Sequence, residues 1–216
     1  MLNKFKTIYK PAEIEIFEKK SRFIGYAFPL ECEEAAMAEL AALRKMHAKA
    51  AHNCFAYCIG QKGQLTRQSD DGEPSGTAGM PILDFIQKQD IKNILIVVTR
   101  YFGGTLLGTG GLVRAYGRAA KEAATAAIII EKVLYQQFDI TVPYTLGGKI
   151  EHEIRTKGWI LTDTQYTDNI VFTVYTEIPN ADALENHITN ITASTAEINR
   201  MAAVYCADIE GKFTIF

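Results

Sequence analysis

Residues 70–79 read Asp-Asp-Gly-Glu-Pro-Ser-Gly-Thr-Ala-Gly, and residues 99–111 read Thr-Arg-Tyr-Phe-Gly-Gly-Thr-Leu-Leu-Gly-Thr-Gly-Gly. Eight of the chain's 16 glycines lie between residues 70 and 116, interrupted by acids, arginines, threonines and aromatic residues. A flexible linker repeats Gly and Ser without such interruptions. Clustered glycine beside polar groups indicates backbone with positive φ, or backbone that another group must approach closely. We therefore expect these two segments to form a site around which the chain is organised.

The composition is that of an ordinary globular protein. The 216 residues are 48% hydrophobic and 22% charged, which suffices for a sizeable core in one large domain or two small ones. A formal net charge of -2 excludes a globally basic nucleic-acid binder but is compatible with a local basic patch. Four scattered cysteines do not make a disulfide scaffold. The first residues lack the apolar region of a signal peptide, and the apolar runs are too short to cross a bilayer. We expect a cytoplasmic protein with no membrane partner.

The first half of the chain predicts a sheet with helices packed on it. Alternating or continuous apolar runs predict strands at residues 12–19, 21–28, 53–59, 64–68 and 93–101. Helical spacing and composition predict helices at residues 33–47, 81–89 and 112–127, with Pro81 as the first residue of its helix. We expect a mixed sheet backed by two long helices and one short helix.

The second half has a different and more compact order of elements. The pattern predicts, in sequence, a strand, a helix, two strands, a helix and a strand at 137–142, 145–157, 159–166, 170–176, 180–192 and 197–209. This β-α-β-β-α-β order is the ferredoxin-like arrangement. We therefore expect two domains, residues 1–134 and 135–216.

The second glycine segment suggests a phosphate site without matching a phosphate motif. It lacks the lysine of a P-loop, and it fails the dinucleotide pattern at its last glycine. A buried strand nevertheless enters a glycine-rich turn from which a helix begins. Free N–H groups there, together with Thr105 and Thr109, can hold an anion, and Arg100 and Arg114 would add positive charge. The alternative is a tight turn required only for packing.

The first segment offers the carboxylates of Asp70, Asp71 and Glu73. It lacks the ligand spacing of an EF-hand loop. A Mg²⁺ site shared with a bound phosphate is one interpretation. Pairing of the acids with nearby arginines such as Arg67 and Arg100 is the interpretation that we favour.

The histidines, the cysteines and Ser75 do not form a recognisable catalytic or metal-binding motif. His47, His52, Cys54 and Cys58 do not have the spacing of common zinc sites. Along one strand the two cysteines would stand more than about 10 Å apart, which favours core residues. His52 opens a strand and is a candidate site residue. Ser75 lacks the Gly-x-Ser-x-Gly context of an activated nucleophile. We assign no catalytic residue, no metal ion and no cofactor.

These segments together resemble the IMPACT family, in its bacterial YigZ branch. Further matching stretches are Lys-Ser-Arg-Phe-Ile at 20–24, Ala-His-Asn-Cys-Phe-Ala-Tyr at 51–57 and Gly-Gly-Leu-Val-Arg-Ala-Tyr at 110–116. The resemblance implies an α+β chain. Its N-terminal α/β sandwich would be similar to domain 2 of ribosomal protein S5, and its C-terminal ferredoxin-like domain to late domains of an elongation factor. Eukaryotic relatives are regarded as translation regulators, and they carry a different partner-binding domain. The resemblance supplies no catalytic residues.

We expect a non-enzymatic protein that regulates translation by binding RNA, the ribosome or a translation-associated protein through the glycine-rich surface. Tyr101 would stack on a base. The expected contact residues are Arg22, His52, Arg100, Tyr101, Gly103, Gly104, Thr105, Gly108, Gly110 and Arg114. One alternative is a metal-assisted phosphate-ester hydrolase or phosphotransferase that uses Asp70, Asp71 and Glu73. A protein-interaction module without a nucleic-acid ligand is a further alternative, and the sequence leaves the oligomeric state open.

Overall fold

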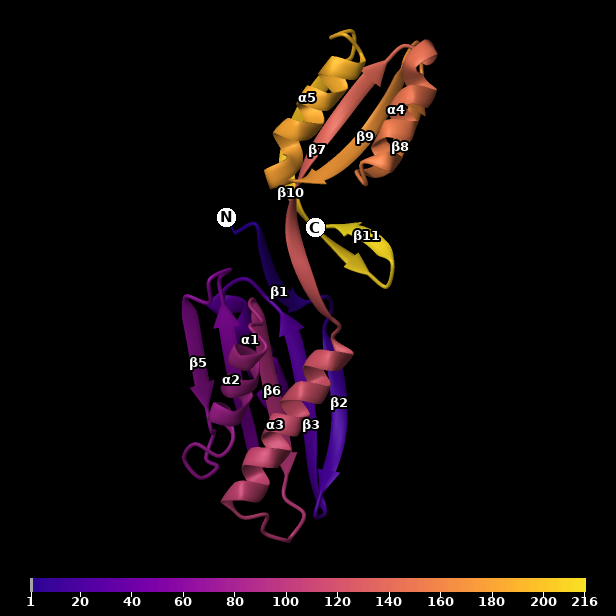
Figure 1. Ribbon diagram of the computed structural model, residues 1–216. Helices are drawn as coiled ribbons and strands as arrows, with labels where there is room; N and C mark the ends of the chain where they lie inside the picture. Colours follow the sequence, from indigo (N-terminus) through magenta and orange to yellow (C-terminus); the bar gives the residue numbers. More distant parts are fainter. Residues whose placement is uncertain (1) are drawn as a thin grey trace. The chain divides into compact units, whose positions relative to one another are not determined.

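The computed structural model describes residues 2–216, and the chain divides into two compact units with the boundary between Glu131 and Lys132 (Figure 1). We refer to them as unit 1 and unit 2. The strand β7 (Ile129–Val142) runs across this boundary. The sequence predicts its strand only from residue 137, because apolar residues stand next to one another over residues 129–136 (Ile-Ile-Glu-Lys-Val-Leu-Tyr-Gln) instead of alternating with polar ones.

Unit 1 contains a five-stranded sheet in the order β2-β3-β6-β4-β5. Its strands are β2 (Ala12–Glu18), β3 (Ser21–Pro29), β4 (His52–Ile59), β5 (Leu65–Ser69) and β6 (Ile94–Tyr101). All four pairings are antiparallel, so the expectation of a mixed sheet was wrong. Continuous apolar runs are typical of parallel strands. In β6 the run has another cause, because helices cover both of its faces.

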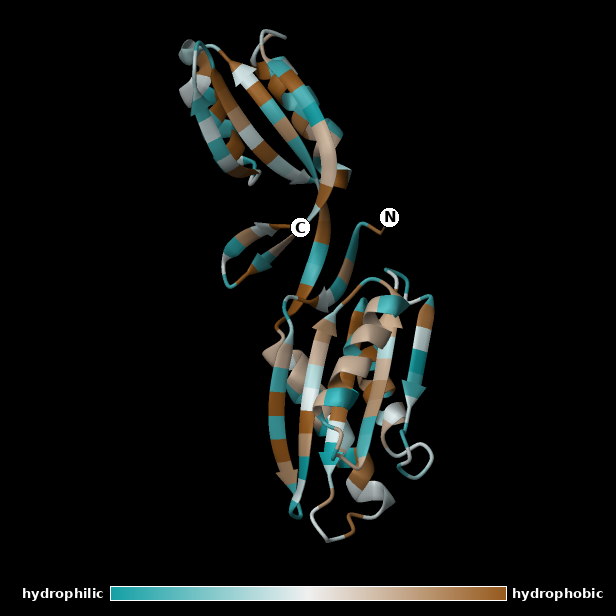
Figure 2. Cartoon of the chain, turned by 180° about the vertical axis from the view of Figure 1, so that it is seen from behind, coloured by the Kyte–Doolittle hydropathy of each residue, from teal (hydrophilic) through white to brown (hydrophobic). Residues whose placement is uncertain are grey.

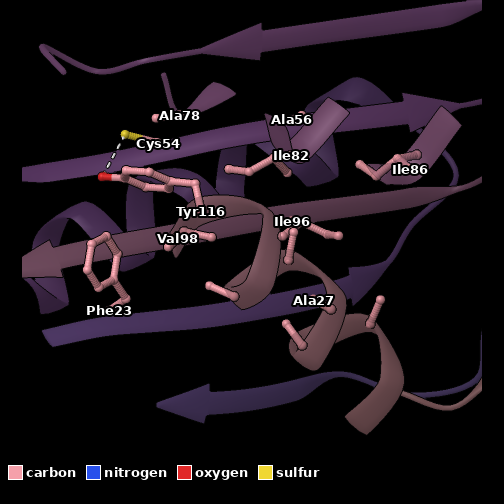
Figure 3. Close-up of a cluster of buried hydrophobic side chains, with 14 of the residues drawn as sticks. Phe23, Ala27, Cys54, Ala56, Ala78, Ile82, Ile86, Ile96, Val98 and Tyr116 are labelled. Carbon is pink, nitrogen blue, oxygen red and sulfur yellow. Dashed lines mark hydrogen bonds between the residues drawn. The ribbon is translucent and has the colours of Figure 1, made fainter. Parts of the chain in front are cut away.

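Three helices form the outer layers of unit 1. The helix α1 (Glu33–Met46) packs on the sheet face that carries Tyr57 and Val97. The helices α2 (Gly79–Lys88) and α3 (Thr109–Ala126) pack on the opposite face, where Ile96 lies (Figure 3). The edge strand β2 alternates hydrophilic and hydrophobic residues along its length (Figure 2).

Two helices begin earlier than the sequence predicts. α2 starts at Gly79, which puts Pro81 at its third position, and α3 starts at Thr109. Glycine weakens a helix interior, so the sequence places Gly110 and Gly111 before α3. The first turn tolerates them, and proline is likewise accepted there because the first N–H groups have no intrahelical acceptor.

Unit 2 has the expected β-α-β-β-α-β order. The elements are β7, α4 (Tyr144–Thr156), β8 (Ile160–Tyr166), β9 (Ile170–Glu177), the 3₁₀ turn η1 (Ile178–Asn180), α5 (Ala181–Ile191) and β10 (Glu197–Ile209). Both helices share one core with the strands, centred on Phe138, Phe172 and Val174. The sheet order is β11-β10-β7-β9-β8. None of the helices within residues 2–216 combines the length and hydropathy that a bilayer-spanning helix needs.

The structure also contains two short strands that the sequence does not predict. They are β1 (Lys4–Ile8) in unit 1 and β11 (Lys212–Ile215) in unit 2. β11 returns along β10 through a turn in which Glu210 and Gly211 have positive φ. At five and four residues, both are too short for a clear alternation of apolar and polar side chains.

Candidate functional site

Both glycine-rich segments lie at the same end of the unit 1 sheet (Figure 1). We call residues 70–78 the acidic loop, residues 102–108 the glycine loop, and residues 19–20 the β2–β3 turn. The strand register brings them together, because Arg100 of β6 stands opposite both Phe23 of β3 and His52 of β4. The loops therefore come from three places in the sequence to one surface.

A buried ion pair fastens the acidic loop to the sheet. Nη1 of Arg100 lies 2.6 Å from Oε1 of Glu73, and the two side chains are only 6% and 3% exposed. Nη2 of Arg100 also donates to Oγ of Ser21 at 3.3 Å. The expected pairing of Arg100 with an acid of this loop is present, whereas Arg67 pairs instead with Glu33. The sequence places Arg100 among the residues that are expected to contact a ligand at the surface. The structure corrects this expectation, because the Arg100 side chain is buried.

The ion pair continues into a buried hydrogen-bonded cluster. The hydroxyl of Tyr116 donates to Oε1 of Glu73 at 2.9 Å. The thiol of Cys54 lies 3.4 Å from this hydroxyl and 2.9 Å from the carbonyl oxygen of Asp70 (Figure 3). Burial raises the pKa of Cys54 to about 12, and burial also raises the pKa of Tyr116. Both groups stay protonated near neutral pH, so Cys54 has none of the thiolate character of a nucleophile.

Asp70 holds the acidic loop against the start of α2. Its carboxylate accepts backbone N–H groups of Gly76, Ala78 and Gly79 at 2.8, 3.0 and 2.8 Å. The N-cap residue of α2, Ala78, has no capping side chain. Asp70 therefore supplies from outside the helix the acceptor that a capping residue would normally provide.

Asp71 and His52 secure the other side of the loop. The carboxylate of Asp71 accepts the N–H of Asn53 at 2.7 Å and pairs with Arg44 at 3.0 Å. Nδ1 of His52 lies 2.8 Å from the carbonyl oxygen of Asp71, and Nε2 lies 3.9 Å from Glu73. His52 thus contacts the acidic loop. Within residues 2–216, no three or more His, Cys, Asp and Glu side chains are grouped to hold a metal ion.

We predict that Asp70→Asn lowers stability at neutral pH by about 1 kcal/mol and flattens its decline in acid. Burial raises the pKa of Asp70, but the hydrogen bonds from three backbone N–H groups lower it by a larger amount. The pKa of Asp70 therefore lies below its usual value. A lowered carboxyl pKa stabilises the fold above the unfolded-state pKa, and this contribution is lost as pH falls through the folded-state pKa. Urea unfolding at a series of pH values measures it. Asp84→Asn, an exposed change on α2, is the control; equal pH profiles for both variants would contradict the prediction.

Arg22 and Tyr101 lie on the opposite face of the sheet from Arg100, because side chains alternate along a strand. The guanidinium of Arg22 lies 5.7 Å from the Tyr101 ring and pairs with Glu15 at 2.5 Å. The Tyr101 hydroxyl lies 2.9 Å from Nδ1 of His47. The expected contact residues are therefore divided between two faces.

The glycine loop and the start of α3 form the exposed part of the site. Gly104, Thr105, Gly108 and Gly110 are exposed. Gly104 and Gly108 have φ of 80° and 73°, a conformation that favours glycine. No side chain caps the first turn of α3, so its N–H groups are available to an anion. A Cβ on Gly110 would lie 3.6 Å from Nη1 of Arg114, so this guanidinium reaches back over the first turn.

A small cleft of about 230 Å³ lies between the β2–β3 turn and α3. Its charged lining residues are Lys19, Arg114, Arg118 and Glu18. A shallower groove of about 620 Å³ along α3 also contains Arg118, together with Lys121. Of these basic residues, only Arg114 is among the contact residues that the sequence predicts. The spacing of Arg114 and Arg118 by four residues was a usable signal, whereas the proximity of Lys19 depends on the fold.

The charges at this end of unit 1 are unequally paired. Asp71, Glu73 and Glu15 each have a basic partner. In the described part of the chain, no ion pair engages five basic side chains at this end, namely Lys19, Lys20, Lys45, Lys49 and Arg114. Glu18 and Asp70 have no ion pair among the described residues, but the five unpaired cations outnumber them and give this surface a local positive charge despite the net charge of the chain.

Comparisons with known proteins match both units. The Impact N-terminal domain matches residues 19–124, and a domain of unknown function, DUF1949, matches residues 140–195. IMPACT family member YvyE of Bacillus subtilis is 37% identical over 205 residues, which are 95% of this chain and 94% of YvyE. IMPACT family member YigZ of Escherichia coli is 40% identical over 128 residues, which are 58% of this chain and 63% of YigZ.

Two solved structures are similar to this chain to different extents. A crystal structure described as that of a hypothetical protein covers 94% of this chain and 99% of its own, with 27% identity and a TM-score of 0.59. A structure of the two-domain translational regulator Yih1 covers 56% of this chain and 46% of its own, with 32% identity and a TM-score of 0.34.

Proposed function

Because this chain belongs to the IMPACT family, we propose that it is a non-enzymatic, cytoplasmic regulator of translation that binds RNA. The proposed contact surface consists of the β2–β3 turn, the glycine loop and the first turns of α3. The observation that carries the proposal is the cleft of about 230 Å³ that brings together Lys19, Arg114 and Arg118. The role in translation is what the family resemblance implies.

The chemistry of this cleft suits phosphate groups. Lysine and arginine side chains supply most of the affinity for a nucleic-acid backbone. The uncapped start of α3 adds N–H groups and the positive end of the helix dipole. Exposed glycines beside it allow a ligand to approach the backbone closely. Two different elements contribute the cations, so a phosphate in the cleft would be approached from both sides.

The acidic loop is compatible with RNA binding, because arginines neutralise two of its three carboxylates. Glu73 is buried against Arg100, and Asp71 is paired with Arg44, so neither presents a free carboxylate at the surface. The same contacts count against a phosphate-ester hydrolase or phosphotransferase. Such an enzyme would need the oxygen atoms of Asp70, Asp71 and Glu73 to face a common metal ion, whereas here they bond to backbone N–H groups and arginines.

We predict that the Lys19→Ala and Arg114→Ala double variant weakens binding to single-stranded oligouridylate about tenfold or more. Each lost phosphate contact should also reduce the slope of log affinity against log salt by about 0.7. Binding titrations over a salt series, with oligouridylate and with purified ribosomes, measure both quantities.

A matched control removes the same charge elsewhere. Lys62→Ala with Lys88→Ala changes two exposed lysines, one in the β4–β5 turn and one at the end of α2, which lie at the opposite end of unit 1. The control should keep the wild-type affinity and slope. Equal affinities and slopes for both double variants would overturn the proposed surface.

A further inference from the structure

Unit 2 contains a cleft of about 530 Å³ that lies outside the surface proposed above. The α4–β8 turn, the end of β9, the start of α5 and Tyr135 of β7 form its walls. This volume falls within the range of about 300–1,000 Å³ that is typical of small-molecule sites. Every lining residue belongs to unit 2.

Aromatic rings form one part of the lining. Trp159, Tyr135 and Tyr175 all border the cleft. The two tyrosine rings pack against Phe213 at centroid distances of 5.3 and 5.5 Å, which holds them in place. Trp159 is only partly buried, and its ring contacts the His187 ring edge to face. Fixed aromatic walls are suited to a planar ring.

Polar groups converge on the same cleft. Lys157 is exposed at its rim, and no ion pair engages it among residues 2–216. Nε2 of His187 lies 2.7 Å from the carboxylate of Glu153, which orients the imidazole. Among the described lining residues, the only carboxylate is that of Glu177. His187 is already paired with Glu153, so the unpaired ammonium group of Lys157 is the group that would attract an anion.

Thr176 adds a hydroxyl group to the lining. Its residue is 5% exposed and lines the cleft. Its hydroxyl is not one of the fully buried atoms without a hydrogen-bond partner among the described residues, so it is open to solvent or to a ligand. A few polar groups in an aromatic cavity are what fixes a ligand's orientation.

We propose that this cleft binds a planar aromatic ring that carries an anionic group. The ring would lie against Trp159 and the tyrosines, the anion would pair with Lys157, and Thr176 would bond to a polar atom of the ring. A nucleoside monophosphate has this chemistry, either free or as the end of an RNA strand. The site is separate from the unit 1 surface, so either one can fail alone.

Trp159 is the single tryptophan of the chain, so tryptophan fluorescence reports directly on this cleft. Titration with adenosine and uridine monophosphates should quench it with saturation, whereas ribose phosphate, which lacks a base, should not. A short oligoribonucleotide forms a second arm. Stronger binding of the mononucleotide assigns a free ligand, and stronger binding of the oligonucleotide assigns a strand end.

Two variants test the residues. Lys157→Gln should raise the dissociation constant about tenfold, because it removes one charge-assisted contact, and Thr176→Val should raise it less. Lys212→Gln changes an exposed lysine of the same unit outside the lining and should leave binding unchanged. Fluorescence that none of the mononucleotides or oligonucleotides changes would overturn the proposal. Quenching that neither cleft variant alters would overturn it equally.

Discussion

Glu73→Ala is expected to lower the free energy of unfolding of unit 1 by about 3–5 kcal/mol, because it leaves Arg100 as an unpaired buried charge. The carboxylate that is removed also accepts the hydroxyl of Tyr116. Nε of Arg100 is already buried without a hydrogen-bond partner among the described residues, and the neutral hydroxyl of Ser21 would remain as the side-chain acceptor of the guanidinium. Urea unfolding followed by far-ultraviolet circular dichroism measures the loss. Trp159 fluorescence monitors unit 2 separately, and its transition should not move.

Two further variants distinguish the effect of breaking the buried ion pair from the effect of removing a charge at an exposed position. Glu122→Ala breaks the exposed pair with Arg118 on α3 and should cost less than about 0.5 kcal/mol. Glu73→Leu combined with Arg100→Met replaces the buried pair by apolar side chains and should recover much of the stability, because no charge then remains buried. A loss for Glu73→Ala as small as that for Glu122→Ala would contradict this account of the acidic loop.

Gly103→Ala is expected to cost about 3 kcal/mol, at the upper end of overpacking effects. A Cβ at this position would lie 2.0 Å from the carbonyl oxygen of Lys20 and 2.5 Å from the backbone nitrogen of Ser21. Both are backbone atoms, so the glycine loop must move away from the β2–β3 turn. The bond from the Gly103 N–H to Oγ of Ser21, at 3.3 Å, would be lost with it. Thermal unfolding gives the change in stability.

The same substitution should weaken RNA binding, because it separates Lys19 from Arg114 across the cleft. For the change in stability, Gly110→Ala is the matched control. Its Cβ would meet only Nη1 of Arg114, at 3.6 Å, and its φ is not positive. Alanine there should leave stability unchanged or slightly raised, since it favours the helix. Equal stability of the two variants would show that the glycine loop does not depend on close contact with the turn.

The sequence predicts the elements of unit 1 well, but it predicts the environment of Arg100 incorrectly. The apolar run before Arg100 shows that β6 is buried on both faces. By alternation, Arg100 shares a face with Ile96 and Val98 and must point into the core. The sequence does favour pairing of Arg100 with an acid of this loop, but only the fold identifies that acid as Glu73, 27 residues away.

Two basic residues of the cleft of about 230 Å³, Lys19 and Arg118, are not among the contact residues that the sequence predicts, and the reason is similar. Arg118 follows Arg114 by one helical turn, so the sequence contained enough information to place them on one face. Lys19 belongs to a different element, and only the packing of α3 against β2 and β3 brings it near. Local patterns thus predict which residues share a face, while contacts between distant elements require the fold.

The most direct test of the proposed RNA surface is a map of backbone amide shifts in the nuclear magnetic resonance spectrum during titration with single-stranded oligouridylate. We predict that the largest shifts fall in residues 18–22 and 102–115, and that they fade as salt is raised. The amides of α1 and the end of unit 1 near Lys62 should stay unchanged. Shifts confined to those regions, with Gly104, Gly108 and Gly110 unmoved, would contradict the proposal.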